Sequence, residues 1–308
     1  MRLTSGLVDG REELWWITGD GPLRVALVAG LRGEVETNWT MMKVLCEGQR
    51  AMDQLQAWLS WALERGLKTD RIPQQTLAPV PRPGKILCVG LNYRPHVRES
   101  RMELPVEPVL FSKYANTVVG PDTRVHPPAD AKQVDYEAEL VMIMGRRCAR
   151  VPVEQALSCV AGYCNGNDLS ARDLQFRSSQ WLLGKTPDGF APMGPYLVTA
   201  EEVPDPNQLE IVGRRNGVEV QHANTRDMIF SCPDLISYLS RYITLDPGDV
   251  IFTGTPEGVI LGQSEGQRHW LRAGETVSVA VEGLGELTTV IGDFGQETTS
   301  AAEIASRR

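Results

Sequence analysis

The chain has 308 residues, of which 42% are hydrophobic and 23% charged, and this ordinary globular composition excludes a disordered or fibrous protein. Its formal net charge is -8 and its Lys and Arg residues are scattered, which argues against nucleic acid as a partner. Residues 1–10 lack the features of a secretory signal, and no stretch reaches the roughly 18 consecutive apolar residues of a membrane span. We therefore expect a cytoplasmic protein with no membrane partner.

Residues 1–75 have the pattern of a small N-terminal α/β domain. Short alternating apolar runs at residues 14–17 and 23–28 indicate strands. A helix is predicted within residues 40–65, where four apolar residues recur at three- and four-residue spacing: Met52, Leu55, Leu59 and Leu63. Gly66 stands at the expected position of a C-cap, so the helix is predicted to end there.

A proline-rich linker at residues 76–83 is expected to separate this unit from a larger domain, residues 84–296. The larger domain alternates irregularly between strand and helix patterns, which predicts a β-rich α+β fold rather than a doubly wound parallel sheet. The predicted strands are residues 85–91, 108–112, 136–144, 249–253, 275–282 and 286–292. The predicted helices are residues 153–163 and 233–243. Residues 297–308 are predicted to form a frayed tail.

Two glutamates, Glu137 and Glu139, stand two residues apart within the apolar segment 136–144. Residues two apart in a strand point to the same face, so the two carboxylates would lie side by side. Buried carboxylates repel each other unless a cation neutralises them or one of them takes up a proton. The alternative is a solvent-facing surface, which would also expose Val141 and Ile143.

A third acid, Asp168, begins a turn-like segment from which its side chain can project freely, although capping a helix is an alternative role. Three carboxylates without a nearby Cys or His form a hard oxygen ligand set that suits Mg²⁺, Mn²⁺ or Ca²⁺. Such a set leaves positions open for water and substrate, which indicates catalysis. The six cysteines form no C-x-x-C pair, so neither a zinc site nor a redox pair is expected.

Five segments in a fixed order resemble the signature motifs of the fumarylacetoacetate hydrolase family. They are residues 90–99, 135–140, 167–175, 181–186 and 248–259. The resemblance implies a mixed β-sandwich roll for the larger domain and assembly as a homodimer. It also implies that Glu137, Glu139 and Asp168 hold Mg²⁺ or Mn²⁺, with Ca²⁺ as a substitute.

The resemblance assigns roles to six further residues. It implies three catalytic residues and three substrate-binding residues: His96, Glu99 and Lys185, then Arg172, Gln175 and Thr255. His96 and Glu99 would form a dyad on a mobile lid, whereas the residues alone also allow an isolated surface histidine. Lys185 has a solvated lysine as its alternative, and it is not part of a phosphate-binding loop because Ser179 replaces the opening glycine. Asn92 stands where larger members of the family have an acidic residue, so a fourth carboxylate is not expected.

The resemblance implies a small 2-oxo acid as substrate and a metal-bound enolate as the common intermediate. The favoured reaction is hydrolysis of a C–C bond in a 2,4-dioxo acid of the acylpyruvate or fumarylpyruvate type, with His96 deprotonating the attacking water. Decarboxylation of an oxaloacetate-type acid and isomerisation of a hydroxydienedioate are alternatives at the same site. A ligand-binding protein that retains the fold is the non-enzymatic alternative.

Overall fold

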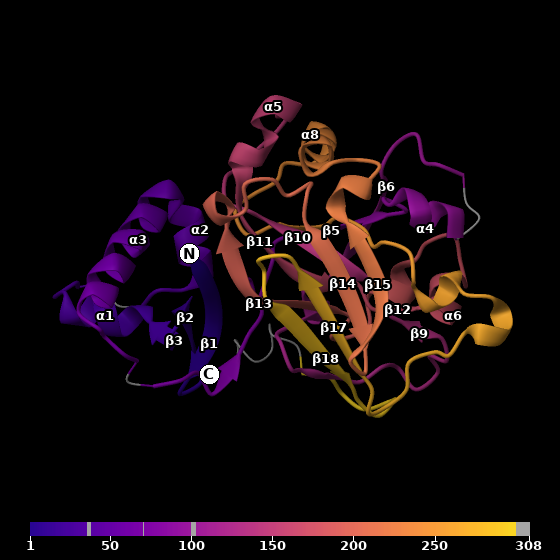
Figure 1. Ribbon diagram of the computed structural model, residues 1–308, viewed down its shortest axis with the longest axis horizontal. Coiled ribbons are helices and arrows are strands. Elements are labelled where there is room, and N and C mark those ends of the chain that lie inside the picture. Colours follow the sequence, from indigo (N-terminus) through magenta and orange to yellow (C-terminus); the bar gives the residue numbers. More distant parts are fainter. Residues whose placement is uncertain (36–37, 70, 100–102, 300–308) are drawn as a thin grey trace.

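The computed structural model describes residues 1–35, 38–69, 71–99 and 103–299, and these residues form the expected β-rich α+β fold (Figure 1). Most strands belong to one large mixed sheet. From edge to edge its strands are β3 (Gly21–Arg24), β2 (Arg11–Thr18), β1 (Arg2–Val8), β13 (Ala191–Thr199), β11 (Val160–Asn167), β10 (Ala138–Met144), β16 (Val250–Phe252), β5 (Ile86–Gly90) and β6 (Val109–Lys113). Two short strands pair off this path, β4 (Gln75–Thr76) with β1 and β7 (Val118–Val119) with β13.

A second sheet of five strands packs against the large one. Its strands in order are β15 (Val218–Asn224), β14 (Glu210–Arg215), β17 (Thr276–Val281), β18 (Glu286–Ile291) and β8 (Arg124–Val125). The layer between the sheets contains Leu140 and Met142 of β10 together with Val279 and Val281 of β17. A short pair, β9 (Val134–Asp135) with β12 (Ser170–Ala171), lies beside the start of β10. The predicted β-sandwich is therefore confirmed.

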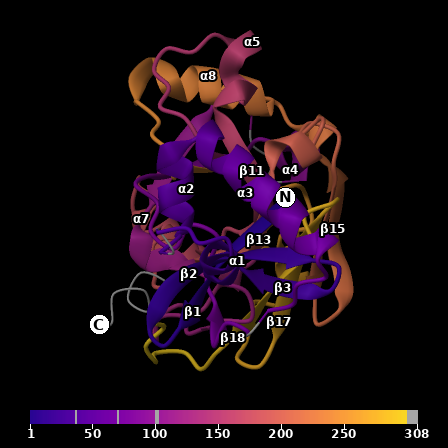
Figure 2. The ribbon, with the colours of Figure 1, turned by 90° about the vertical axis from the view of Figure 1, so that its left-hand side faces the viewer.

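Helices cover the ends and edges of the two sheets. They are α1 (Val25–Leu31), α2 (Met41–Glu47), α3 (Gln49–Glu64), α4 (Arg94–Glu99), α5 (Val153–Ala156), α6 (Arg172–Gln175), α7 (Leu182–Lys185) and α8 (Cys232–Tyr242). In both views α5 and α8 lie together at one end of the molecule (Figures 1 and 2). Ser231 and Asp234 begin α8 with a capping box, which satisfies backbone donors of its first turn. No helix among the described residues is long and apolar enough to span a bilayer.

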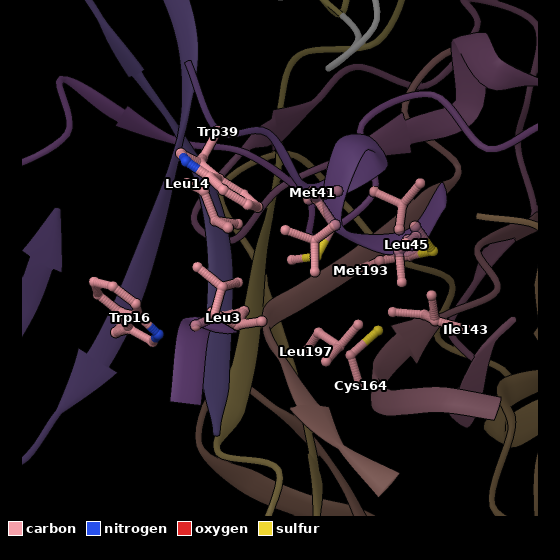
Figure 3. Close-up of a cluster of buried hydrophobic side chains, with 14 of the residues drawn as sticks. Leu3, Leu14, Trp16, Trp39, Met41, Leu45, Ile143, Cys164, Met193 and Leu197 are labelled. Carbon is pink, nitrogen blue, oxygen red and sulfur yellow. The ribbon is translucent and has the colours of Figure 1, made fainter. Parts of the chain in front are cut away.

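The N-terminal unit, on the left in Figure 1, shares the large sheet with the rest of the chain. Strand β1 pairs antiparallel with β13, and Leu3 lies opposite Leu197. Figure 3 shows Leu3 in one apolar cluster with Met41 of α2 and Ile143 of β10. The core is thus continuous from β1 to β10, while the division into domains at residues 76–83 stays a prediction.

Strand β10 lies in the interior, and every one of its residues is buried. Val141 and Ile143 face the cluster that includes the N-terminal helices, whereas Leu140 and Met142 face the second sheet. Val141 and Ile143 have no exposed surface, so the alternative of a solvent-facing side for the glutamates is wrong. The strand begins at Ala138, two residues later than predicted, and Glu137 directly precedes it.

The structure corrects the predicted secondary structure of two segments, residues 153–163 and residues 23–28. Residues 153–163 form a helix only up to Ala156, followed by a 3₁₀ turn, and β11 begins at Val160. Because β11 is buried nearly throughout, it lacks the alternation that identifies a half-exposed strand. Residues 23–28 leave the strand at Arg24 and enter α1.

The helix predicted within residues 40–65 is divided into α2 and α3 at Gly48, whose φ is +66°. Glycine adopts this left-handed conformation without the strain that a side chain adds. The predicted C-cap is confirmed at Gly66, with a φ of +60°. Part of the predicted tail, residues 300–308, lies outside the described residues.

The linker from the N-terminal unit passes close to Gly120, and this contact predicts an effect on stability. A Cβ at Gly120 would lie 2.6 Å from the carbonyl oxygen of Thr76 and 2.7 Å from the carbonyl carbon of Leu77. Because two backbone segments must separate, Gly120→Ala is expected to lower the free energy of unfolding by about 1–3 kcal/mol. Urea denaturation followed by circular dichroism measures the change.

Gly30→Ala is the matched control because a Cβ at Gly30, in α1, would have no atom within 4 Å. Alanine is favoured over glycine within a helix by up to about 1 kcal/mol, so this variant is expected to gain stability. Equal effects of the two substitutions would contradict the close contact at Gly120.

Candidate functional site

A cavity of about 630 Å³ contains most of the side chains that the sequence predicted for the site. Its lining includes Glu137, Glu139, His96, Glu99, Lys185, Arg172, Gln175 and Thr255. Asp168 is fully buried and does not line the cavity, but its carboxylate adjoins the two glutamates. Residues from five distant segments of the chain therefore meet in one place.

The pairing of β10 with β11 brings the three carboxylates together. Ala138 lies opposite Asn167, so Glu137 and Asp168 are neighbours at the end of this antiparallel pair. The backbone N–H of Asp168 donates to the carbonyl oxygen of Glu137 at 2.9 Å. One carboxylate oxygen from each of Glu137, Glu139 and Asp168 lies within 4.8 Å of the others. Three oxygens this close form a ligand set that fits one hard divalent cation.

Glu139 is the carboxylate whose charge is least compensated. Its side chain accepts a hydrogen bond from the backbone N–H of Gly254 at 2.8 Å, and it forms no ion pair with a described residue. Burial raises the pKa of Glu139 well above its usual value, and the nearby Asp168 and Glu137 carboxylates raise it further. A buried acid in this position needs a proton or a cation, so the residues present fit a divalent metal ion.

Two cationic side chains hold Glu137 in its ionised form. Lys185 Nζ lies 2.7 Å from Glu137 and 2.7 Å from Asp168, while Arg172 Nη2 lies 2.6 Å from Glu137. Burial opposes ionisation of Glu137, but Lys185 and Arg172 outweigh it and lower its pKa. Burial also opposes the charge of Lys185, yet the Asp168 and Glu137 carboxylates raise its pKa. Lys185 is therefore buried and charged, and the solvated lysine is wrong.

Lys113 is a site residue that the sequence analysis missed. It lies at the end of β6, and its Nζ is 2.6 Å from Asp168 Oδ1. The same ammonium donates to the carbonyl oxygens of Leu169 and Phe190, and burial and the charge of Lys185 lower its pKa. The predicted strand ended at Ser112, one residue before it. A lysine adjoining an apolar strand was the available signal.

Asp135 is a second functional residue without a predicted role. Its carboxylate accepts from Arg172 Nε at 2.9 Å and from the backbone N–H groups of Ile260 and Leu261 at 2.9 and 3.0 Å. It therefore fixes Arg172 and connects the segment that begins at Ile260 to β9, directly before Glu137. The motif around residues 135–140 contained it, but sequence alone did not show which groups it would bind.

His96 and Glu99 come from α4, and both line the cavity. His96 Nδ1 lies 3.5 Å from Glu99 Oε2, and the Glu99 carboxylate also accepts from the backbone N–H of Gly258 at 3.2 Å. His96 is only 7% exposed, so the alternative of an isolated surface histidine is wrong. The role of α4 as a mobile lid stays a prediction.

The three predicted substrate-binding residues are largely engaged with the protein. Arg172 Nη1 donates to Gln175 Oε1 at 3.0 Å, in addition to its ion pairs. The Thr255 hydroxyl donates to the carbonyl oxygen of Ala138 and accepts from Gln221 Nε2. These contacts position the side chains against the cavity, and their contacts with substrate stay predictions.

Asn92 is buried, and its side chain connects two backbone segments beside the cavity by hydrogen bonds. Its amide donates to the carbonyl oxygens of Thr253 and Phe230 at 2.7 and 3.1 Å, and its oxygen accepts from the backbone N–H of Phe230 at 2.8 Å. The side chain is fully occupied by backbone partners.

Known proteins are similar to this chain in both sequence and fold. The family model "Fumarylacetoacetate (FAA) hydrolase C-terminal" matches residues 85–292. The human protein named oxaloacetate tautomerase FAHD2A, mitochondrial, is 45% identical over 211 residues, which are 68% of this chain and 67% of the human one.

Two solved structures agree with this relation. Fumarylacetoacetate hydrolase from Exiguobacterium antarcticum has a TM-score of 0.77 and 30% identity, covering 95% of this chain and 99% of that one. Maleylpyruvate hydrolase from Sphingobium sp. SYK-6, in complex with manganese(II) and pyruvate, has a TM-score of 0.76 and 29% identity, covering 96% and 100%. With a family match over more than half of its length, this chain belongs to the fumarylacetoacetate hydrolase family.

Proposed function

We propose that the protein is a divalent-metal enzyme that interconverts the keto and enol forms of an oxaloacetate-type 2-oxo acid. The observation that carries this proposal is the buried Glu137, Glu139 and Asp168 cluster, which opens onto a cavity that also contains a histidine. The name of the 45% identical human relative supports keto–enol interconversion over the other reactions of the family. The sequence motifs alone favour hydrolysis and do not indicate keto–enol interconversion.

The three carboxylates would hold Mg²⁺ or Mn²⁺, and Ca²⁺ is a candidate substitute because all are oxygen-preferring cations. The manganese and pyruvate complex of a similar hydrolase supports Mn²⁺ as a working cation and a 2-oxo acid as ligand. When bound, the cation would supply positive charge where negative charge develops on the 2-oxo oxygen.

Side chains of the protein would transfer the protons of the reaction. With hydrogen on Nδ1 facing Glu99, the Nε2 atom of His96 is free to accept a proton from C3 of the substrate. The same imidazole would return a proton to the 2-oxo oxygen, so substrate and product remain isomers. Lys185 would keep its proton and maintain the positions of Glu137 and Asp168. Arg172 would orient Gln175 toward the bound acid.

Hydrolysis of a C–C bond in a 2,4-dioxo acid is the second candidate function. The His96 and Glu99 pair favours it because a base oriented by a carboxylate can deprotonate water, and the similar maleylpyruvate hydrolase supports it. Hydroxide would add to the 4-oxo carbon, and the C3–C4 bond would break. The proton that His96 took from water would pass to C3, which gives pyruvate and a carboxylic acid.

The proposal also includes assembly as a homodimer, and light scattering measures the mass of the assembly.

Assays with two substrates test the proposed function. With Mg²⁺ or Mn²⁺, we expect the protein to accelerate decay of the ultraviolet absorbance of enol-oxaloacetate without release of CO₂. Pyruvate released from acetylpyruvate would instead favour hydrolysis, and CO₂ beyond the metal-only rate would favour decarboxylation. Migration of a carbon–carbon double bond in a hydroxydienedioate would favour isomerisation. Binding without turnover of any of these acids would favour a ligand-binding protein.

Glu139→Gln tests the metal site. Removal of one ligand charge is expected to weaken Mn²⁺ binding by more than about 100-fold, the upper range for loss of outer-shell partners, and to abolish turnover. The fold should persist because the neutral amide would not add to the carboxylate repulsion. Calorimetric titration with Mn²⁺ measures the affinity, and Glu286→Gln, at the exposed start of β18, is the matched control. Wild-type Mn²⁺ affinity in Glu139→Gln would remove Glu139 from the ligand set.

His96→Gln tests the proposed proton carrier. We expect turnover to fall by about 10²-fold or more, the usual scale for a general base, while Mn²⁺ affinity stays within a few-fold of wild type. His222→Gln is the control because His222 is half exposed and pairs with Glu210 and Glu219 away from the cavity. If His96→Gln and His222→Gln turn over equally fast, His96 carries no proton in the reaction.

A further inference from the structure

The cavity is lined by three permanently cationic side chains, and one of them differs from the others. Lys185 and Arg172 are buried and form ion pairs with the carboxylates at the metal site. Arg268 is partly exposed and forms no ion pair with any described residue. Its charge is therefore available to an anion that enters the cavity.

The guanidinium of Arg268 is held in place by its own loop. Its Nε donates to the carbonyl oxygen of Gln263 at 2.9 Å, and neither Nη group has a hydrogen bond to a described residue. Between Gln263 and Arg268, residues 265–267 form one 3₁₀ turn. The backbone N–H of Gln267 donates to the carbonyl oxygen of Ser264 at 2.8 Å and supports this turn. The backbone contact fixes one edge of the guanidinium and leaves the two-pronged edge for a carboxylate.

The loop itself is attached to the metal-ligand region at both ends. At its start, Ile260 and Leu261 donate to the Asp135 carboxylate. At its end, the backbone N–H of Leu271 donates to the carbonyl oxygen of Val134 at 2.9 Å. Arg268 is thus carried on a segment whose position relative to the metal ligands is fixed by hydrogen bonds.

Arg268 stands where the cavity meets the outer surface. It lines both the main cavity and an adjoining surface hollow of about 460 Å³, whose lining also includes Lys132 and Arg272. These three cations make this side of the entrance positive. Glu265 lines the same entrance and opposes them with one negative charge, but it forms no ion pair with Arg268. Positive charge around an entrance attracts anionic substrates.

We propose that Arg268 binds the second carboxylate of the substrate and makes the enzyme selective for dicarboxylic 2-oxo acids. This inference rests on the proposed function, in which the first carboxylate and the 2-oxo group lie at the metal end. The substrate then spans the cavity from the buried carboxylate cluster to the guanidinium at the entrance. A monocarboxylic 2-oxo acid would satisfy the inner end and leave Arg268 without its partner.

Arg268→Gln tests the proposal in two assays. The first is turnover of enol-oxaloacetate against the enol of its 4-methyl ester, which lacks the second charge. We expect Arg268→Gln to lower kcat/KM for the dicarboxylate by about 10-fold or more, through KM, because hydrogen bonds to charged groups are the stronger class. The ester should change by less than about threefold.

The second assay measures binding of unreactive analogues in the presence of Mn²⁺. Wild type is expected to bind malate more tightly than lactate, and Arg268→Gln should lose this preference while its Mn²⁺ affinity is unchanged. Arg11→Gln is the matched control, because Arg11 is exposed at the start of β2 and lines neither the cavity nor the outer hollow. Glu265→Gln should strengthen malate binding, since it removes a like charge from the entrance.

The two assays separate failure of this inference from failure of the proposed function. A preference for malate that disappears in Arg268→Gln supports the role of Arg268 even if oxaloacetate is not turned over. Equal losses for dicarboxylate and ester, or an unchanged preference for malate, would overturn it. No preference for malate in the wild type would overturn it as well, whatever the rate of turnover.

Discussion

The structure depends on a cluster of buried carboxylates whose negative charge exceeds that of the cationic side chains around them. Glu137, Glu139, Asp168 and Asp135 are all buried, and the buried cations that face them are Lys113, Lys185 and Arg172. A buried charge without compensation is costly, so the remaining negative charge must be neutralised by a proton or by a cation. Two strands pair so that their ends present acids, and three cationic side chains converge from separate elements.

The cationic side chains divide the carboxylates into two kinds. Glu137 is paired with Lys185 and Arg172, which favour its ionised form, and Asp168 contacts two lysines. Glu139 has only a backbone N–H, so its charge state follows what else occupies the site. The protein therefore fixes Glu137 and Asp168 with ion pairs and leaves Glu139 as the carboxylate whose charge state depends on a proton or a cation.

Residues with a local signature were predictable from the sequence, and residues defined by distant partners were not. Glu137 and Glu139 could be identified because two acids two residues apart in an apolar strand point to the same face and repel each other. The partners of Lys113 and Asp135 could not be read from their local sequence, because they are Asp168 and the backbone of Ile260, far along the chain. Strand β11 was mistaken for a helix over residues 160–163 because burial on both faces removes the alternation that marks a strand.

The segment from Ile260 to Leu271 is joined to β9 at its two ends by hydrogen bonds to Asp135 and Val134, and Ile260 and Leu271 pack in the same apolar cluster as Val134. Its middle contributes no strand to either sheet and no ligand to the carboxylate cluster. Substitutions and changes of length there alter the entrance while the reactive centre keeps its geometry. Because the entrance and the carboxylate cluster are separate, mutations in this segment can change which substrates enter without moving the carboxylates.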